Sequence, residues 1–242
     1  MPFETENLST LAINVASSTQ DRILGTYLTR TNNSFDIISL EEAMPIDDDF
    51  ISKSSLPSRH TLLHKYIENY LDAEYYYGHR KYEEQYPQMI YELLDTYNVT
   101  YEKTNYSGRS SNFDLYKSAI PIFKKLSHDA FGILFKNRKL MQDFSRLIAT
   151  IHDRQFTRPN YWPVWLKKAI FYRDHGRCGI CNCDLTGLIA IDKEIHIDHM
   201  VPISLFGTND PTNLQILCDS CNLKKGNRSA DTSSIRHAPW KL

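Results

Sequence analysis

The spacing of apolar residues predicts that the first two thirds of the chain are mainly helical. From about residue 57 onward, apolar side chains recur at steps of three and four, which places them on one face of an α-helix. The clearest stripe is formed by Leu63, Tyr66, Ile67, Tyr70 and Leu71. Similar spacing predicts a helix over residues 89–97, a helix over 113–126 that is interrupted at Pro121, and one or two helices over 131–151.

The first 50 residues show no such regular stripe. Short strands are expected over residues 23–29 and 35–38, where β-branched and aromatic residues gather. The segment from residue 36 to 49 contains no basic residue, and its acidic residues are Asp36, Glu41, Glu42, Asp47, Asp48 and Asp49. A solvated acidic loop is the simplest interpretation. A mimic of nucleic-acid charge and a strip that docks a partner are the alternatives.

Two prolines, Pro159 and Pro163, end the helical pattern and indicate a domain boundary. We therefore divide the chain into a helical domain, residues 1–156, a linker, residues 157–163, and a C-terminal domain, residues 164–242. The sequence does not indicate the role of the helical domain, for which regulation or partner binding is the working hypothesis.

The C-terminal domain is predicted to contain a helix, two strands and a second helix. The first helix starts at Pro163, where a missing N–H costs nothing, and ends before Gly176. Residues 195–199 form a short strand pattern that ends in an acid and an imidazole, Asp198 and His199. A second strand is expected over residues 214–218, and a short helix over 221–225 with Gly226 as its cap.

Composition and charge add little, except through their distribution along the chain. The 242 residues are 41% hydrophobic and 24% charged, as in ordinary globular proteins, and contain no apolar run of membrane-spanning length. The N-terminal residues lack the features of a secretion signal, so a cytoplasmic location is expected. Residues 154–242 carry 12 Lys and Arg against 8 Asp and Glu, a balance of +4, which leaves 16 against 21, or −5, for residues 1–153. This asymmetry suits an anion-binding module joined to a different domain.

The cysteines predict a structural zinc site. All five lie in the last third of the chain, and four of them form two Cys-x-x-Cys pairs: Cys178 with Cys181, and Cys218 with Cys221. Two such pairs match the spacing of a tetrahedral Cys₄ zinc site, in which each tight turn directs two thiolates at one ion. Cys183 is an alternative to Cys181, because a four-residue gap is also permitted.

The residues between the cysteine pairs carry candidate catalytic chemistry. If the hairpin closes as predicted, Asp198, His199 and Asn222 come together in one cleft. Carboxylate and carboxamide oxygens suit a hard cation such as Mg²⁺ or Mn²⁺. A neutral imidazole suits the removal of a proton from water near neutral pH. These are parts for the hydrolysis of a phosphodiester.

At these residues the chain resembles the HNH endonuclease family. The motifs are Ile195-His196-Ile197-Asp198-His199-x-x-Pro202, Asn213-Leu214-Gln215-x-Leu217-Cys218-x-x-Cys221-Asn222-x-x-Lys225-Gly226, and the upstream Tyr172-Arg173-Asp174-His175-Gly176-Arg177-Cys178-x-x-Cys181. The resemblance covers about residues 165–228, and Asn222 at the last signature position is typical of the H-N-N variant.

The resemblance implies a ββα-metal fold for the small C-terminal domain. Together with the mainly helical pattern of the N-terminal domain and the predicted Cys₄ zinc knuckle, this makes the chain α+β. It implies that His199 is the general base, that Asp198 and Asn222 bind a catalytic Mg²⁺ or Mn²⁺, and that Asn213 holds the loop and helps to orient His199. Phosphate contacts are expected from Lys224, Lys225 and Arg228. The role of His196 stays open between a site residue and a surface residue.

The implied function is a metal-dependent endonuclease that hydrolyses nucleic acid, with DNA favoured over RNA. An HNH module joined to a helical domain also suggests an effector of restriction or phage defence, with a protein partner or regulator bound through the helical domain. The alternative is a zinc-stabilised nucleic-acid-binding module that acts as a scaffold and does not cleave.

Overall fold

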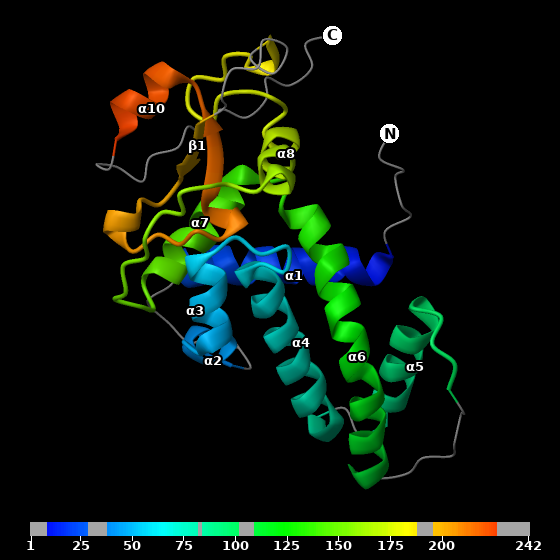
Figure 1. Cartoon of the computed structure of the whole chain (residues 1–242). Helices are drawn as coiled ribbons and strands as arrows, with labels where there is room; N and C mark the ends of the chain where they lie inside the picture. The colour runs from blue at the N-terminus through cyan, green and yellow to red at the C-terminus, as the bar shows by residue number, and fades with distance from the viewer. Residues whose placement is uncertain (1–8, 29–37, 82–83, 102–108, 188–195, 227–242) are drawn as a thin grey trace. The chain divides into compact units, whose positions relative to one another are not determined.

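The structure is a computed structural model that describes residues 9–28, 38–81, 84–101, 109–187 and 196–226. It is mostly helical, with a small two-stranded sheet near the C-terminal end of the described chain (Figure 1). No helix among the described residues has both the length and the apolar character that a membrane crossing requires.

The contacts divide the chain into two compact units, which we name after their content. The helical unit comprises residues 1–22, 31–45 and 63–133, and the sheet unit comprises residues 23–30, 46–62 and 134–242. Residues 46–62 and 134–156 thus pack with the C-terminal segment, although we had assigned them to the helical domain. The functional division of the chain at residues 157–163 stays a prediction.

The described residues of the helical unit form five helices, of which α1, α4 and α6 extend beyond the unit by one or a few residues. They are α1 (Thr10–Leu28), α2 (Leu40–Ala43), α4 (Leu62–Lys81), α5 (Tyr86–Thr96) and α6 (Arg109–Leu134). Helices α4 and α5 confirm the stripes noted in the sequence. The strand expected over residues 23–29 is wrong, because residues 23–28 continue α1. Residues 35–37 of the other expected strand lie outside the described residues.

Helix α6 continues through Pro121, where an interruption was expected. Proline removes one backbone hydrogen bond and normally kinks or ends a helix. Here the helix is supported by its buried apolar side, which includes Ala119, Ile122, Phe123 and Leu126. Tertiary packing therefore outweighs the local cost of the proline.

Helix α4 packs against α6 within the helical unit (Figure 1). The rings of Tyr75 and Phe123 have their centroids 5.3 Å apart. The Tyr116 hydroxyl donates a 2.6 Å hydrogen bond to Asp72 Oδ1, and the Ser127 hydroxyl donates a 2.7 Å bond to Glu68 Oε1. An aromatic contact and two polar contacts thus join the same pair of helices.

The acidic segment forms helix starts instead of the loop that we expected. In α2, Ser39 and Glu42 form a capping box, in which each side chain accepts a hydrogen bond from the other's backbone N–H. In α3 (Asp48–Ser55), the Asp47 side chain accepts a 2.8 Å bond from Phe50 N. Carboxylates at helix N-termini satisfy unpaired N–H groups and offset the positive end of the helix dipole. Local capping therefore accounts for much of this acidic cluster.

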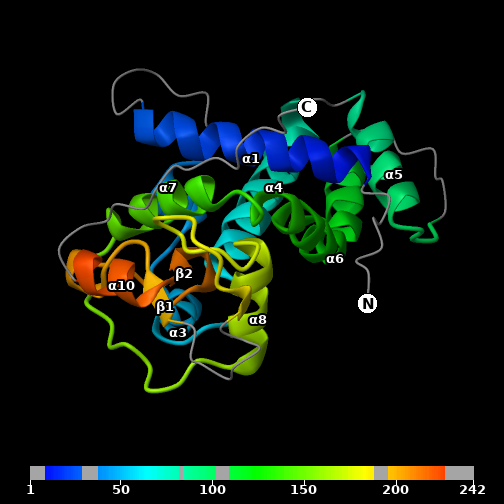
Figure 2. The ribbon, with the colours of Figure 1, turned by 90° about the horizontal axis from the view of Figure 1, so that it is seen from above.

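The sheet unit is built around a short antiparallel hairpin (Figure 2). Besides α3, its elements are α7 (Arg138–Ala149), α8 (Val164–Arg173), β1 (His196–His199), the 3₁₀ turns η1 (Ile203–Leu205) and η2 (Pro211–Asn213), β2 (Leu214–Leu217) and α10 (Asp219–Lys225). The register pairs His196 with Leu217 and His199 with Leu214. The two strands and the two helices predicted for this region are therefore present.

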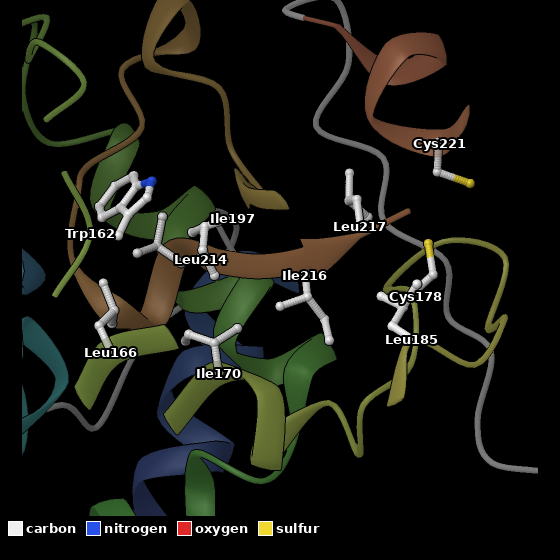
Figure 3. Packing of buried hydrophobic residues seen from close by; sticks show 10 residues of the cluster. All are labelled: Trp162, Leu166, Ile170, Cys178, Leu185, Ile197, Leu214, Ile216, Leu217 and Cys221. Carbon is white, nitrogen blue, oxygen red and sulfur yellow. The ribbon is translucent and has the colours of Figure 1, made fainter. Parts of the chain in front are cut away.

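One face of the hairpin contributes to a continuous apolar core (Figure 3). Ile197 on β1 and Leu214 and Ile216 on β2 are buried together with Leu166 and Ile170 of α8. The same cluster also contains Trp162, Cys178, Leu185, Leu217 and Cys221. Burying one face of the hairpin against α8 gives two four-residue strands the support that they lack alone.

A buried ion pair connects α8 to β2. Arg173 Nε lies 2.8 Å from Asp174 Oδ1, and both side chains are almost fully buried. Asp174 Oδ2 accepts a 3.2 Å hydrogen bond from Ile216 N, while Arg173 Nη2 donates a 2.6 Å bond to Leu214 O. Arg138 of α7 adds a second positive charge, 3.6 Å from Asp174 Oδ1. The pair thus fixes the position of β2 through its backbone.

The loop between the strands makes a close backbone approach that requires glycine. An ideal Cβ on Gly207 would lie 1.8 Å from the carbonyl oxygen of Val201. Gly207 N also donates a 2.9 Å hydrogen bond to Pro202 O, which closes the turn. A side chain at this position would force the backbone apart, because backbone atoms cannot yield as a flexible side chain can.

Gly207→Ala is therefore expected to lower the free energy of unfolding by about 3 kcal/mol, as overpacking of a closed site does. Chemical denaturation measures this loss. Gly132→Ala is the matched control, since no atom lies within 4 Å of its added Cβ in α6. The control should be neutral or slightly stabilising, because alanine favours a helix interior. An equally stable Gly207→Ala would contradict the close approach.

Candidate functional site

Four cysteine sulfurs gather at one end of the hairpin. The Sγ atoms of Cys178, Cys181, Cys218 and Cys221 all lie within 4.8 Å of one another. Figure 3 shows Cys178 and Cys221 on two separate segments, with the sulfur of Cys178 pointing toward the segment that carries Cys221. Sulfurs at this separation can ligate one tetrahedral ion, and a set of four thiolates is typical of structural zinc.

The first pair lies in a short knuckle that is attached to β2. An isolated antiparallel bridge joins Arg177 to Asp184, and Cys178 N donates a 3.0 Å hydrogen bond to Cys183 O. Gly179 N donates a 2.8 Å bond to Ile216 O. A Cβ on Gly179 would lie 2.6 Å from Gln215 Oε1 and 3.3 Å from Ile216 O, so the knuckle lies close to β2 and a side chain here would displace the Gln215 carboxamide.

Cys183 lies beside this cluster but is not one of the four. Desolvation comes first among the causes that raise the pKa of Cys183 to about 12, followed by the adjacent thiols of Cys181 and Cys218. The second pair belongs to α10, with Cys218 as its N-cap residue and Cys221 in its first turn. Of the two alternatives left open by spacing, the geometry favours Cys181.

His199 lies at the end of β1 and is 5% exposed. Its Nε2 is 2.8 Å from Asn209 Oδ1, and its ring centroid is 5.7 Å from that of Trp162. Burial lowers the pKa of His199 to about 4, although the bond to Asn209 and the nearby Asp198 carboxylate act in the opposite direction. The imidazole is therefore neutral at pH 7, and no described residue hydrogen-bonds to its Nδ1.

Asp198 points to the other face of the hairpin, as alternation along a strand requires. Its Oδ2 accepts a 3.0 Å hydrogen bond from Gln215 Nε2, the residue opposite it in the register. Lys225 Nζ lies 2.9 Å from the same oxygen and also donates a 2.6 Å bond to His199 O. Within the described part of the chain, Oδ1 of Asp198 makes no hydrogen bond.

Helix α10 lies over that face of β1 and brings Asn222 to it. Asp219, at the start of the helix, lies 2.7 Å from His196 Nε2, and Lys225, at its end, contacts Asp198. Asn222 is spaced three residues from each, so it lies on the same side of the helix between these two contacts. The half-buried Asn222 side chain makes no hydrogen bond to any described residue.

A carboxylate oxygen and a carboxamide oxygen are thus available on one side of the hairpin. This donor set fits a hard divalent cation that completes its coordination with water and substrate oxygens. Lys225 contacts only Oδ2 of Asp198. The atoms that would hold the ion are therefore Oδ1 of Asp198 and Oδ1 of Asn222.

Asn213 contacts the loop between the strands through hydrogen bonds that do not include His199. Its side chain accepts a 2.8 Å hydrogen bond from Val201 N and donates 2.9 Å bonds to Val201 O and Thr208 O. Its backbone oxygen accepts a 2.7 Å bond from Met200 N. The direct contact with the imidazole comes instead from Asn209, which the sequence analysis had not singled out.

The three expected phosphate contacts differ in their placement. Lys224 is exposed on α10, as a contact with substrate requires. Lys225 is only 6% exposed, because its ammonium group contacts Asp198 and the His199 carbonyl; its role as a phosphate contact stays a prediction. Arg228 lies outside the described residues.

The segment 157–163, which we had interpreted as a linker, contacts the site directly. Thr157 O accepts a 2.9 Å hydrogen bond from Asn209 Nδ2, and Arg158 Nη2 donates a 2.8 Å bond to Ile197 O. Trp162 packs beside His199. The two prolines of this segment signalled a break in helical structure, and that signal carries no information on where the segment packs.

Comparison with known proteins identifies one family. Residues 178–228 match the family model described as HNH endonuclease, a segment that contains both cysteine pairs and β1 through α10. No curated protein and no solved structure matches the chain.

Replacing a ligand of the four-thiol cluster is expected to abolish zinc binding. Cys181→Ser should lower the zinc content from one ion per chain to near zero, and lower the melting temperature, because a structural ion contributes folding free energy. Cys183→Ser is the matched control and should retain the ion. Elemental analysis of the purified protein and thermal unfolding measure both effects. Zinc loss in the control alone would reverse the choice between Cys181 and Cys183.

Proposed function

We propose that the C-terminal segment, residues 164–242, is an HNH nuclease of ββα-metal type that hydrolyses phosphodiester bonds in nucleic acid. The observation that carries the proposal is the match of residues 178–228 to this family in a segment where His199, Asp198 and Asn222 surround one short hairpin and helix. DNA is the substrate that we place first. The four-thiol cluster would hold a structural Zn²⁺.

In this proposal His199 accepts a proton from the attacking water at Nδ1. A buried ring whose Nε2 is held by Asn209 presents a single nitrogen to substrate, which is the orientation that a general base needs. Asp198 and Asn222 would hold Mg²⁺ or Mn²⁺. When bound, such an ion stabilises negative charge on the phosphate and on the leaving oxygen.

The remaining polar residues position these groups or meet the substrate. Gln215 and Lys225 hold Asp198 through its Oδ2 atom, and Oδ1 of Asp198 would bind the cation. Asn213 keeps the loop closed behind His199. Lys224, and Arg228 beyond the described residues, are proposed to contact phosphates, while His196 holds α10 to β1 through Asp219.

The alternative function is a zinc-stabilised module that binds nucleic acid as a scaffold without cutting it. The ion pair between Lys225 and Asp198 favours this alternative, because an ammonium group already neutralises the carboxylate that a cation would need. For residues 1–156 we propose a regulatory or partner-binding role, supported by the net charge of −5 that residues 1–153 carry (16 Lys and Arg against 21 Asp and Glu). Such an arrangement would suit an effector of restriction or phage defence.

Cleavage assays decide between the two functions. Zinc-loaded protein is incubated with supercoiled plasmid, single-stranded DNA and RNA, with and without Mg²⁺ or Mn²⁺. Cleavage is expected only with a divalent cation, and His199→Ala should reduce its rate by about 10²–10⁴-fold, the usual contribution of a general base. His128→Ala, which removes an exposed imidazole from α6, is the control. Tight binding without cleavage of any substrate would favour the scaffold.

A second prediction concerns the cation. Asn222→Ala is expected to raise the Mg²⁺ concentration that gives half-maximal cleavage by about tenfold or more, because even indirect loss of support for a ligand weakens metal binding by 10–100-fold. Asn222→Asp should retain binding, since a carboxylate is also a hard oxygen donor. Leu223→Ala, at the neighbouring and 82% exposed position, serves as the control. Mn²⁺ binding measured by calorimetry must follow the same order, and an unchanged affinity in Asn222→Ala would exclude Asn222 as a ligand.

A further inference from the structure

Asn209 is a fully buried polar residue that connects three distant segments of the chain. Its backbone N–H donates a 2.9 Å hydrogen bond to Ser54 O. Its side-chain Nδ2 donates 2.9 Å bonds to both Ser55 O and Thr157 O, and its Oδ1 lies 2.8 Å from His199 Nε2. The donors and the acceptor of its carboxamide are therefore all used, and the exposed fraction of the residue is 0%.

These contacts determine which way the carboxamide points. Backbone carbonyls only accept hydrogen bonds, so the NH₂ group must face Ser55 O and Thr157 O, and the oxygen must face the imidazole. An oxygen accepts only, which means that His199 Nε2 carries the proton. The unprotonated ring nitrogen is then Nδ1. A single amide thus selects both the orientation of the ring and its tautomer.

The anchor of Asn209 is the C-terminal end of α3. Ser54 and Ser55 are the last residues of this helix, where carbonyl groups have no partner within the helix. The C-terminal end of a helix also carries partial negative charge, which favours an N–H donor. Two hydrogen bonds from Asn209 satisfy these carbonyls, so the loop and the helix end stabilise each other.

Helix α3 is itself firmly held within the sheet unit. Asp47 caps its first turn, and Phe50 is fully buried with its ring centroid 5.5 Å from that of His152. Immediately after Asn209, Asp210 Oδ2 accepts a 2.8 Å hydrogen bond from Leu62 N. Residues 46–62 are thus joined to the loop of the candidate site at two successive positions.

We propose that Asn209 is the positioning residue for His199 and that the end of α3, with the Thr157 carbonyl, is the support on which it acts. The inference rests on the proposed function, in which His199 is the general base. It extends that function to residues 46–62, which lie more than 100 positions before the segment 178–228 that matches the HNH family.

The arrangement has a specific consequence for proton transfer. Hydrogen bonds from Nδ2 to two carbonyls polarise the carboxamide and make its oxygen a better acceptor. A stronger bond at Nε2 holds the ring in the Nε2–H tautomer and keeps the lone pair of Nδ1 available to water. Without Asn209 the His199 ring can rotate and change tautomer. Only a fraction of the molecules would then have the Nε2–H tautomer with Nδ1 facing water.

The test uses Asn209→Ala in the full-length, zinc-loaded chain. Because Asn209 is fully buried, it cannot touch substrate, so kcat should fall by about 10–100-fold with little change in KM, as for residues that orient a functional side chain. Nitrogen NMR of ¹⁵N-labelled histidine should show His199 as the Nε2–H tautomer in the parent chain and as a mixture in Asn209→Ala.

Two further variants separate positioning from folding. Thr212→Val removes the 2.6 Å hydrogen bond from Thr212 to Asp210 in the same buried loop without touching His199, and should lower stability but leave kcat and the tautomer unchanged. Asn209→Asp keeps the oxygen that faces His199 and removes the two donors. It should retain the Nε2–H tautomer, with a kcat between those of Asn209→Ala and the parent chain.

The outcomes distinguish this inference from the proposed function. If the parent chain cleaves, His199→Ala does not, and Asn209→Ala keeps the parent kcat and tautomer, the inference fails while the nuclease assignment stands. If the parent chain cleaves nothing, the proposed function fails, and the tautomer comparison alone decides whether Asn209 orients the ring. Equal losses of kcat in Asn209→Ala and Thr212→Val would assign Asn209 a role in stability only and would overturn the inference. A folded Asn209→Ala chain in which His199 keeps a single tautomer would also overturn it.

Discussion

The register of a four-residue hairpin determines which chemical groups reach each side of the candidate site. Asp198 is paired with Gln215 and His199 with Leu214, so the carboxylate and the imidazole project to opposite faces. A slip of one residue would exchange these faces and would bury the acid in the apolar core. The register is held by the apolar residues around Ile216, by the Asp174 carboxylate on the Ile216 amide, and by the knuckle that bonds to the Ile216 carbonyl.

Two short strands cannot maintain such a register without help, because an isolated hairpin is marginally stable in water. The chain supplies help at both ends of the hairpin. At one end, four thiols bring the knuckle at Cys178 to the start of α10, where a metal ion would lock both segments. At the other end, Asn213 and Gly207 close the loop on the backbone of Val201. The candidate catalytic groups lie between these two closures.

The sequence predicted the features that depend on local spacing. The helical stripes of α4 and α5, the two strands and the cysteine pairs all follow from periodicity or from short motifs, and they are present. The sequence does not indicate features that depend on contacts distant in sequence. Pro121 is accommodated because α6 is packed on its apolar side. Lys225 contacts a carboxylate on another element, Asp198 of β1. Asn209 bonds to a carbonyl 154 residues away, and no local pattern signals such a contact.

The support beneath Asn209 consists of backbone oxygens from residues 54, 55 and 157. Every amino acid offers the same carbonyl group, so substitutions at these three positions preserve the acceptors as long as the backbone keeps its path. Selection acting through this support would therefore constrain the length and direction of α3 and leave its final side chains free to drift. We therefore expect homologues to have no insertions or deletions in residues 46–62. We also expect little sequence identity among them at positions 54, 55 and 157, whose backbone oxygens contact Asn209.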